Sequence, residues 1–342
     1  MRSLSILVVA LLACAGCDSS APDVTQGGPR LSATKVAEWP AAGPARDTAF
    51  SRDGRLLALS DASGAITIRD TGSWRPLEHL NHAGGATSVA FSKDGKQIFS
   101  AGYDGLIREW ERPGGRLLRT FNGTRGTLWT MDVSPDGTKL AAAGEDAVVR
   151  IWDLDSDAPP RELRAHSRNI WRIRFSPDGK HLASGSFDNK VLLWDVGSGR
   201  LMKTLSGHTQ AIVGLDYSPD GSRLASGADD STIRLWRAAD GAALRTLDNG
   251  KHVDAVQFSP NGRWLISGGH AHGAVGAIWR QLTGGGGEGD AVRVWRTTDM
   301  VPVAILPHPD DVISLAISPD GHWLVTSGED SRFRLWRLQE KA

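Results

Sequence analysis

The chain has 342 residues, of which 40% are hydrophobic, so it is long enough for one large core or for two ordinary ones. Lysine plus arginine and aspartate plus glutamate each number 39, so the chain lacks the excess of positive charge that drives nucleic-acid binding. We therefore expect no nucleic-acid partner. The 40 glycines and 13 tryptophans, beside only 2 tyrosines, are typical of a turn-rich β protein with an internal repeat.

Residues 1–16 have the order of an export signal. Arg2 precedes an apolar run from Leu4 to Ala13, which at about ten residues is too short for a membrane-spanning helix. The run ends in Cys14-Ala-Gly-Cys17, which resembles a bacterial lipobox, where small residues precede a lipidated cysteine. We expect Cys17 to carry the lipid, although leucine is usual at the place of Cys14. Cys14 is the alternative acceptor, and an ordinary secretory signal is the alternative to a lipoprotein signal.

No cysteine follows Cys17, so neither cysteine can pair with one in the folded domain, and lipidation is the use that is left. Residues 17–32 are rich in Ser, Pro, Gly and Asp without an apolar pattern, which predicts a flexible tether. We expect the protein to be lipid-anchored in the bacterial cell envelope and to face the periplasm. The lipid would be its only contact with the membrane, and residues 33–342 would form the folded domain.

One four-residue phrase returns seven times beyond the tether and predicts a hairpin at each copy. Serine suits the first position of a tight turn, proline fixes φ at the second, Asp or Asn tolerates the third, and glycine supplies a positive φ. Alternating apolar residues flank the copies, so each turn joins two antiparallel strands. The copies are Ser51-Arg-Asp-Gly54, Ser92-Lys-Asp-Gly95, Ser134-Pro-Asp-Gly137, Ser176-Pro-Asp-Gly179, Ser218-Pro-Asp-Gly221, Ser259-Pro-Asn-Gly262 and Ser318-Pro-Asp-Gly321.

The spacing of these hairpins predicts a propeller. Their glycines are 41, 42, 42, 42, 41 and 59 residues apart, and a period of roughly 40 to 45 residues built of short strands is typical of propeller blades. Every unit but the first also has a strand that ends in tryptophan, at Trp110, Trp152, Trp194, Trp236, Trp295 and Trp336. With Trp152-Asp153, Trp194-Asp195 and Gly207-His208, residues 33–342 resemble the WD40-repeat family. The resemblance implies an all-β fold, a seven-bladed β-propeller.

In that family the outermost strand of each blade follows the tryptophan strand. Too few residues follow Trp336 for another strand, whereas Thr34-Lys-Val-Ala-Glu-Trp39 has the matching pattern. We expect this N-terminal segment to pair outside the strand from Phe333 to Arg337 in the last blade and so to close the ring. Closure leaves no long open sheet edge.

His208, Ser226 and Asp230 have the residue types of a catalytic triad. The same order, or Thr in place of Ser, recurs in three other blades with a tryptophan after each Asp. Because catalysis needs one such site and architecture needs one in each blade, the repetition indicates a structural role. The resemblance implies the buried Asp-His-Ser-Trp tetrad of WD40 blades, and we expect no catalytic residue and no cofactor. The sets are His82, Ser100, Asp104 and Trp110; His166, Ser184, Asp188 and Trp194; His208, Ser226, Asp230 and Trp236; and His308, Thr326, Asp330 and Trp336.

The resemblance also implies a binding face. WD40 partners usually dock around the channel, at the end of the ring that carries the tetrad turns. Aromatic side chains fall at these positions on blades two to four, and Trp and Tyr are common interface anchors; the alternative is that the rings pack beneath loops. We expect a protein or peptide partner to contact Tyr103, Glu145, Phe187 and Asp229 just before the tetrad Asp, and Trp129, Trp171 and Asp254 near the channel mouth.

The long step in blade six predicts an insertion within residues 269–289 on the same face. Trp279 with Arg280 could grip a ligand, and His270, His272, Glu288 and Asp290 could bracket a metal. A His-x-His pair in a glycine-rich loop is weak evidence for metal, so we expect a solvated loop without metal that contributes to specificity.

Taken together, these features predict a scaffold and not an enzyme. The alternative is a propeller enzyme or binding protein that acts on a small molecule or glycan at the channel mouth and the blade-six insertion. The sequence holds no glycine-rich phosphate loop, cysteine metal cluster or non-repeating nucleophile set that would support the alternative.

Overall fold

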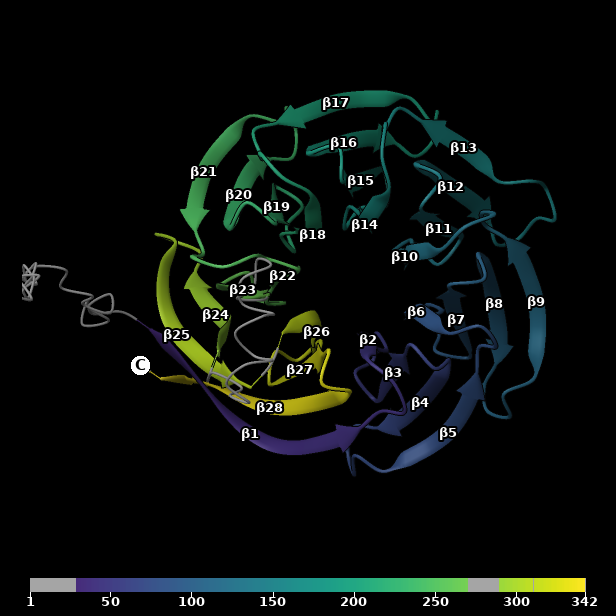
Figure 1. Cartoon of the computed structure of the whole chain (residues 1–342), viewed down its shortest axis with the longest axis horizontal. Coiled ribbons are helices and arrows are strands. Elements are labelled where there is room, and N and C mark those ends of the chain that lie inside the picture. Colours follow the sequence, from purple (N-terminus) through teal and green to yellow (C-terminus); the bar gives the residue numbers. More distant parts are fainter. Residues whose placement is uncertain (1–28, 270–288, 310, 342) are drawn as a thin grey trace, which may run out of the picture.

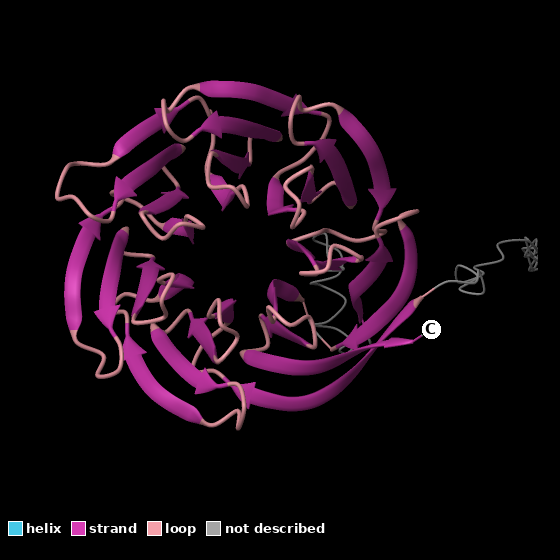
Figure 2. Ribbon diagram, turned by 180° about the vertical axis from the view of Figure 1, so that it is seen from behind, coloured by secondary structure: helices cyan, strands magenta, loops and turns pink. Residues whose placement is uncertain are grey.

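The computed structural model describes residues 29–269, 289–309 and 311–341. Its strands form seven four-stranded antiparallel sheets that are arranged as the blades of a ring (Figures 1 and 2). Every regular element of the described residues is a strand. The predicted all-β, seven-bladed propeller is confirmed.

In blades one to six the four strands follow one another in sequence, and the first strand of each lies innermost (Figure 1). Blade one holds β2 (Ala45–Phe50), β3 (Leu56–Asp61), β4 (Ala65–Asp70) and β5 (Pro76–Asn81), and blade two holds β6 (Ala86–Phe91), β7 (Gln97–Gly102), β8 (Leu106–Glu111) and β9 (Leu117–Asn122). Blade three holds β10 (Leu128–Val133), β11 (Lys139–Gly144), β12 (Val148–Asp153) and β13 (Arg161–Arg164), and blade four holds β14 (Ile170–Phe175), β15 (His181–Ser186), β16 (Lys190–Asp195) and β17 (Leu201–Ser206). Blade five holds β18 (Ile212–Tyr217), β19 (Arg223–Ala228), β20 (Thr232–Arg237) and β21 (Ala243–Asp248), and blade six holds β22 (Ala255–Phe258), β23 (Trp264–Gly268), β24 (Gly289–Arg296) and β25 (Val301–His308).

Blade seven joins the two ends of the described chain. It contains β26 (Val312–Ile317), β27 (Trp323–Gly328), β28 (Arg332–Lys341) and β1 (Arg30–Pro40). β1 pairs with β28 from Arg30 opposite Lys341 to Pro40 opposite Arg332, so the predicted closure of the ring is confirmed. The strand begins four residues before the predicted segment, which started at Thr34, because residues 30–33 continue the ladder and Leu31 is only 5% exposed.

The end of β28 reaches onto blade six. Glu340 accepts hydrogen bonds from the indole N–H of Trp264 at 2.9 Å and from the side-chain amide of Asn261 at 3.0 Å, and it pairs with Arg263 at 2.8 Å. Trp264 is 2% exposed beneath this contact. The strand pair that closes the ring therefore also ties blade seven to blade six.

The core lies between neighbouring blades. Residues 182–186 of β15 are all buried, because both faces of a central strand meet other blades. Val149 and Ile151 of blade three, for example, belong to one apolar cluster with Ile173 and Trp194 of blade four. This packing explains why the central strands read as nearly continuous runs of small and apolar residues.

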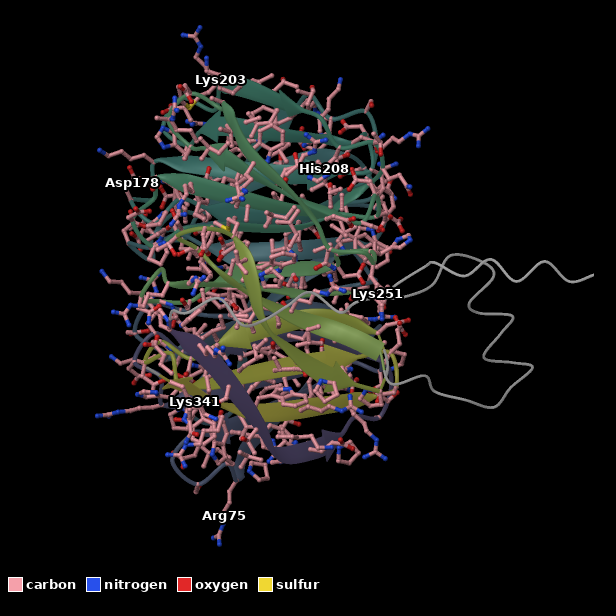
Figure 3. The ribbon with its side chains drawn as sticks, turned by 90° about the vertical axis from the view of Figure 1, so that its left-hand side faces the viewer. Arg75, Asp178, Lys203, His208, Lys251 and Lys341 are labelled. Carbon is pink, nitrogen blue, oxygen red and sulfur yellow. The ribbon has the colours of Figure 1, made fainter. Side chains whose placement is uncertain are left out.

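The repeated hairpins form one end of the ring, which we call the lower face. In blade five the N–H of Gly221 donates to the carbonyl of Ser218 at 2.8 Å, and Gly221 has a φ of 70°. The hydroxyl of Ser218 and the N–H of Ser222 bind the carboxylate of Asp220 and lower its pKa to about 2. The opposite end, the upper face, carries the turns with the tetrad aspartates. Figure 3 shows Asp178 and Lys341 toward the lower face and Lys251 toward the upper face.

Candidate binding face

The His-Ser-Asp set of blade five forms a hydrogen-bond chain that ends on tryptophan. His208 Nδ1 lies 2.9 Å from Asp230 Oδ2, and His208 Nε2 lies 2.8 Å from Ser226 Oγ. Trp236 Nε1 donates to the same Oγ at 2.8 Å. Equivalent chains run in blade four through Asp188, His166, Ser184 and Trp194, and in blade two through Asp104, His82, Ser100 and Trp110.

These contacts resemble those of a serine triad, but burial decides what they can do. Ser226 is 0% exposed, so its hydroxyl is out of reach of a substrate, and it already accepts the proton of Trp236. Burial opposes ionisation of Asp230, yet hydrogen bonds from His208 and Thr232 outweigh it and hold the pKa of Asp230 below its usual range. The chain therefore fixes the segment between β17 and β18 to the two central strands of the blade, β19 and β20.

Blade six contains a related chain that the sequence analysis missed. Ser267 Oγ lies 3.0 Å from Asn249 Oδ1 and accepts the N–H of Trp295 at 3.0 Å, so asparagine takes the place of histidine. The signal was present, because Asn249 precedes Ser267 by 18 residues, the interval between His208 and Ser226. The insertion obscured it by moving the tryptophan to 28 residues beyond the serine.

Blade seven uses an arginine in its chain. Trp336 Nε1 donates to Thr326 Oγ1 at 3.1 Å, and Arg334 donates to His308 Nε2 at 3.2 Å. The guanidinium of Arg334 also binds Asp330, and its Nε lies 3.2 Å from Glu38 of β1. The buried Arg334 thus links the tetrad to the closing strand.

Four predicted aromatic residues come together on the upper face. Tyr103 meets Trp129 edge-on with centroids 5.8 Å apart, Trp129 stacks on Trp171 at 4.5 Å, and Trp171 stacks on Phe187 at 5.5 Å. We call this row from blades two to four the aromatic wall. Because Trp171 is stacked between two other rings, the wall presents ring edges, which carry the positive part of an aromatic quadrupole.

The aromatic wall flanks a cavity of about 470 Å³ at the mouth of the channel. Four of the predicted contact residues line it: Tyr103, Trp129, Trp171 and Asp254. At the Tyr103 end of the wall, Arg46 donates to the hydroxyl of Tyr103 at 2.8 Å and to Glu329 at 2.7 Å. Arg46 thereby joins blades seven, one and two at the rim of the cavity.

Arg172, which the repeat pattern did not indicate, also lines this cavity. Arg172 is 8% exposed and makes no side-chain hydrogen bond to any residue that the structure describes. Burial lowers its pKa, while the charges of Asp47 and Asp254 oppose that shift. Asp47 itself accepts the hydroxyl protons of Ser88 and Ser314, each at 2.8 Å, and so connects three inner strands.

The remaining predicted contact residues lie apart from the cavity or outside the described residues. Glu145 accepts the N–H of Thr127 at 3.2 Å, and Asp229 lies 3.6 Å from His252 Nδ1. Outside the described residues are Trp279, Arg280, His270, His272, Glu288 and the side chain of Asp290. In the part of the chain that the structure describes, no cluster of three or more His, Cys, Asp or Glu could hold a metal ion. The described residues also include no helix that is long and apolar enough to cross a membrane.

The fold and the buried polar chains define a β-propeller with repeated structural tetrads. Six segments match the family model described as WD40, "WD domain, G-beta repeat": residues 74–111, 115–153, 158–195, 199–237, 241–275 and 300–337. These segments make up more than half of the chain, and the chain belongs to this family. Apart from 241–275, each runs from the outer strand of one blade to the tryptophan strand of the next, so the sequence repeat is offset by one strand from the blade.

Curated relatives match over a short stretch only. The Eukaryotic translation initiation factor 3 subunit I of Aspergillus niger is 37% identical over 60 residues, which is 18% of this chain and 18% of that protein. The proteins of the same name from Mycosarcoma maydis and Coccidioides immitis are each 37% identical, over 59 and 60 residues, which is 17% and 18% of this chain and the same shares of those proteins. The chain thus spans less than a fifth of the length of these relatives.

Proposed function

We propose that the protein is a membrane-anchored scaffold of the bacterial cell envelope that binds a protein or peptide partner through its upper face. A lipid on Cys17, or on Cys14 as the alternative, would hold the domain at the membrane on the periplasmic side. The observation that carries the binding role is the aromatic wall beside an open cavity at the channel mouth.

The rigidity of this surface supports recognition of a partner. The rings of the aromatic wall brace one another, and Arg46 is held by both Tyr103 and Glu329, so little side-chain freedom is lost when a partner binds. Aromatic edges, Arg46 and Arg172 offer hydrogen-bond donors and positive potential to carbonyl or carboxylate groups. WD40 propellers are protein-interaction scaffolds, and the curated relatives are named as subunits of a larger factor, which fits a chain that works by holding partners.

A crosslinking pull-down from intact envelopes tests the upper face. We expect a variant with Trp129→Ala and Trp171→Ala to lose one partner selectively, because both anchors of the cavity wall are removed. Trp323→Ala is the matched control, since Trp323 packs edge-on against Trp74, with centroids 5.0 Å apart, outside the cavity. Recovery of the same partners with all three proteins, at equal thermal stability, would contradict the proposed site.

Metabolic labelling with a fatty-acid analogue tests the anchor. We expect Cys17→Ser to abolish the label and to release the protein from the membrane fraction, since lipid attachment supplies the long-lived membrane affinity. Loss of the label only in Cys14→Ser would move the acceptor to Cys14. If the wild type and both variants are secreted but none of them carries the label, the segment is instead an ordinary signal peptide.

One observation favours the alternative function. The cavity volume of about 470 Å³ lies within the range of small-molecule sites. A screen of glycans and metabolites by thermal shift, with the Trp129→Ala and Trp171→Ala variant as the negative control, would detect such a ligand. A hit that depends on the wall, together with an empty pull-down, would replace the scaffold proposal.

A further inference from the structure

A second candidate site lies at the junction of blades four and five toward the lower face. A groove of about 660 Å³ opens there, compared with about 460 Å³ at the junction of blades three and four. Leu193, Met202 and Ala238 form part of its apolar lining, and Lys203 lies at its edge. Figure 3 shows Lys203 pointing outward from the rim of the ring. The volume is in the range that binding sites for small ligands or a few side chains occupy.

At four other junctions, a side chain of the outer strand clamps the next blade. In each case the clamping residue lies two positions before the buried apolar residue of its strand. Arg119 donates to the carbonyl of Leu154 at 3.1 Å, Arg161 to that of Val196 at 3.0 Å and Arg245 to that of Asp299 at 2.5 Å, while Glu78 pairs with Arg112 at 2.5 Å.

Lys203 holds this position in blade four, two residues before the buried Leu205. Its ammonium makes no hydrogen bond or ion pair with any residue in the described ranges. The junction between blades four and five therefore lacks the clamp. A cation is left free beside an open apolar groove.

Tyr217 is the second departure in the same groove. The aligned residues of the other blades are apolar: Phe50, Phe91, Val133, Phe175, Phe258 and Ile317. Tyr217 is 6% exposed, packs with Leu193 and Trp236, and lines the groove, yet its hydroxyl has no hydrogen-bond partner within the described part of the chain. Burial raises its pKa, so the hydroxyl stays protonated. The hydroxyl therefore has no protein partner at the wall of the groove, and it can donate to an acceptor on a ligand.

The two carboxylates of the groove are held within the hairpin turns and remain negatively charged, and the arginine of the groove is paired. Asp178 is bound by the hydroxyl of Ser176 and the N–H of Lys180, and Asp220 is held in the equivalent turn of blade five. The guanidinium of Arg237 pairs with Asp240 at 2.9 Å. Among the lysine and arginine side chains that line the groove, only that of Lys203 is unpaired. Lys203 is therefore the cation with which an anionic group could pair in the groove without breaking an existing ion pair.

We propose that this groove binds an acidic peptide segment of a partner protein. An apolar side chain of the segment would sit against Leu193 and Met202, a neighbouring Asp or Glu carboxylate would pair with Lys203, and an acceptor would receive the hydroxyl proton of Tyr217. The site stands apart from the upper-face cavity and does not depend on it. A scaffold with both sites holds two partners at opposite faces of the ring.

Selection from a random-peptide library displayed on phage tests the proposal. The immobilised full-length protein is the target, and peptides that still bind the Trp129→Ala and Trp171→Ala variant are kept, which excludes ligands of the upper face. We expect the enriched peptides to place an apolar residue beside Asp or Glu. Affinities of the synthesised peptides are then measured by fluorescence polarisation.

Three variants report on the groove. We expect Lys203→Glu to weaken binding about tenfold or more, and Tyr217→Phe to weaken it roughly two- to tenfold. Lys203→Arg keeps the charge but can clamp the carbonyl of Ala238, so it should also weaken binding. The matched control is Lys190→Glu, an exposed position at the upper end of the same blade, which should bind as the wild type does.

The sequences of the enriched peptides and their affinities decide the outcome. Enrichment of basic or uncharged sequences, equal affinity for the wild type and Lys203→Glu, or no enriched peptide would each overturn the proposal. Because the readout is the affinity of purified peptides, it remains distinguishable from success or failure of the upper-face pull-down.

Discussion

Replacing Ser226 by alanine tests whether the tetrads stabilise the blades. The change removes the oxygen that accepts the indole proton of Trp236 and lies in hydrogen-bond contact with His208 Nε2, both at 2.8 Å. Each buried polar group left without a partner costs about 1–3 kcal/mol. Two such groups predict a loss of about 2–6 kcal/mol in the free energy of unfolding. That is a large share of the 5–15 kcal/mol or so by which folded domains are typically stable.

Urea unfolding followed by tryptophan fluorescence measures this loss, since Trp236 belongs to the affected chain. The midpoint is compared at matched slope, because a changed slope would indicate a different unfolded or native state. Ser222→Ala is the control, since Ser222 is exposed and its hydroxyl binds only the nearby Asp220; we expect a change within about 0.5 kcal/mol. A Ser226→Ala midpoint as close to the wild type as that of the control would refute the structural role of the chain.

Two further predictions concern the contact of β28 with blade six and the buried carboxyl group of Asp216. Glu340→Ala leaves the indole N–H of the buried Trp264 without its 2.9 Å acceptor, so the urea midpoint should fall by the equivalent of about 1–3 kcal/mol; an unchanged midpoint would show that the end of β28 does not secure blade six. Burial raises the pKa of Asp216 to about 7, so the native state binds this proton more tightly than the unfolded chain does and loses stability as pH rises from about 4 to 7. Asp216→Asn should remove that loss, so its free energy of unfolding relative to that of the wild type should rise by roughly 3 kcal/mol between about pH 5 and pH 8; a constant difference would contradict the shifted pKa.

The fold could be predicted because each blade repeats its own turn chemistry. Ser218-Pro-Asp-Gly221 specifies a hairpin by local φ preferences, and these survive in every context. The start of β1 could not be predicted, because residues 30–32 carry no turn or strand signal. Their pairing depends on β28, which lies some 300 residues away in the sequence.

The candidate site could be predicted only in part. The repeat places Trp129 and Trp171 at the same height on adjacent blades, so their proximity followed from sequence. Their mutual stacking did not, since ring orientation is set by the lateral spacing of blades and by the edge-on contact with Tyr103. Asn249 could not be predicted from the repeat because histidine holds its place in the other tetrads. Arg172 could not be predicted because the side chains of an inner strand differ from blade to blade while the repeat motif does not.

The pairing of β1 with β28 determines when the ring can close during synthesis of the chain. β1 is the first strand of the domain to leave the ribosome and β28 is the last of those described. Until β28 is available, β1 has no partner and the ring stays open with unpaired strand edges at both sides of the gap. A nascent chain, or one shortened to end before β28, therefore exposes edges that can pair with other chains, and protection against aggregation arrives only when β28 has been synthesised.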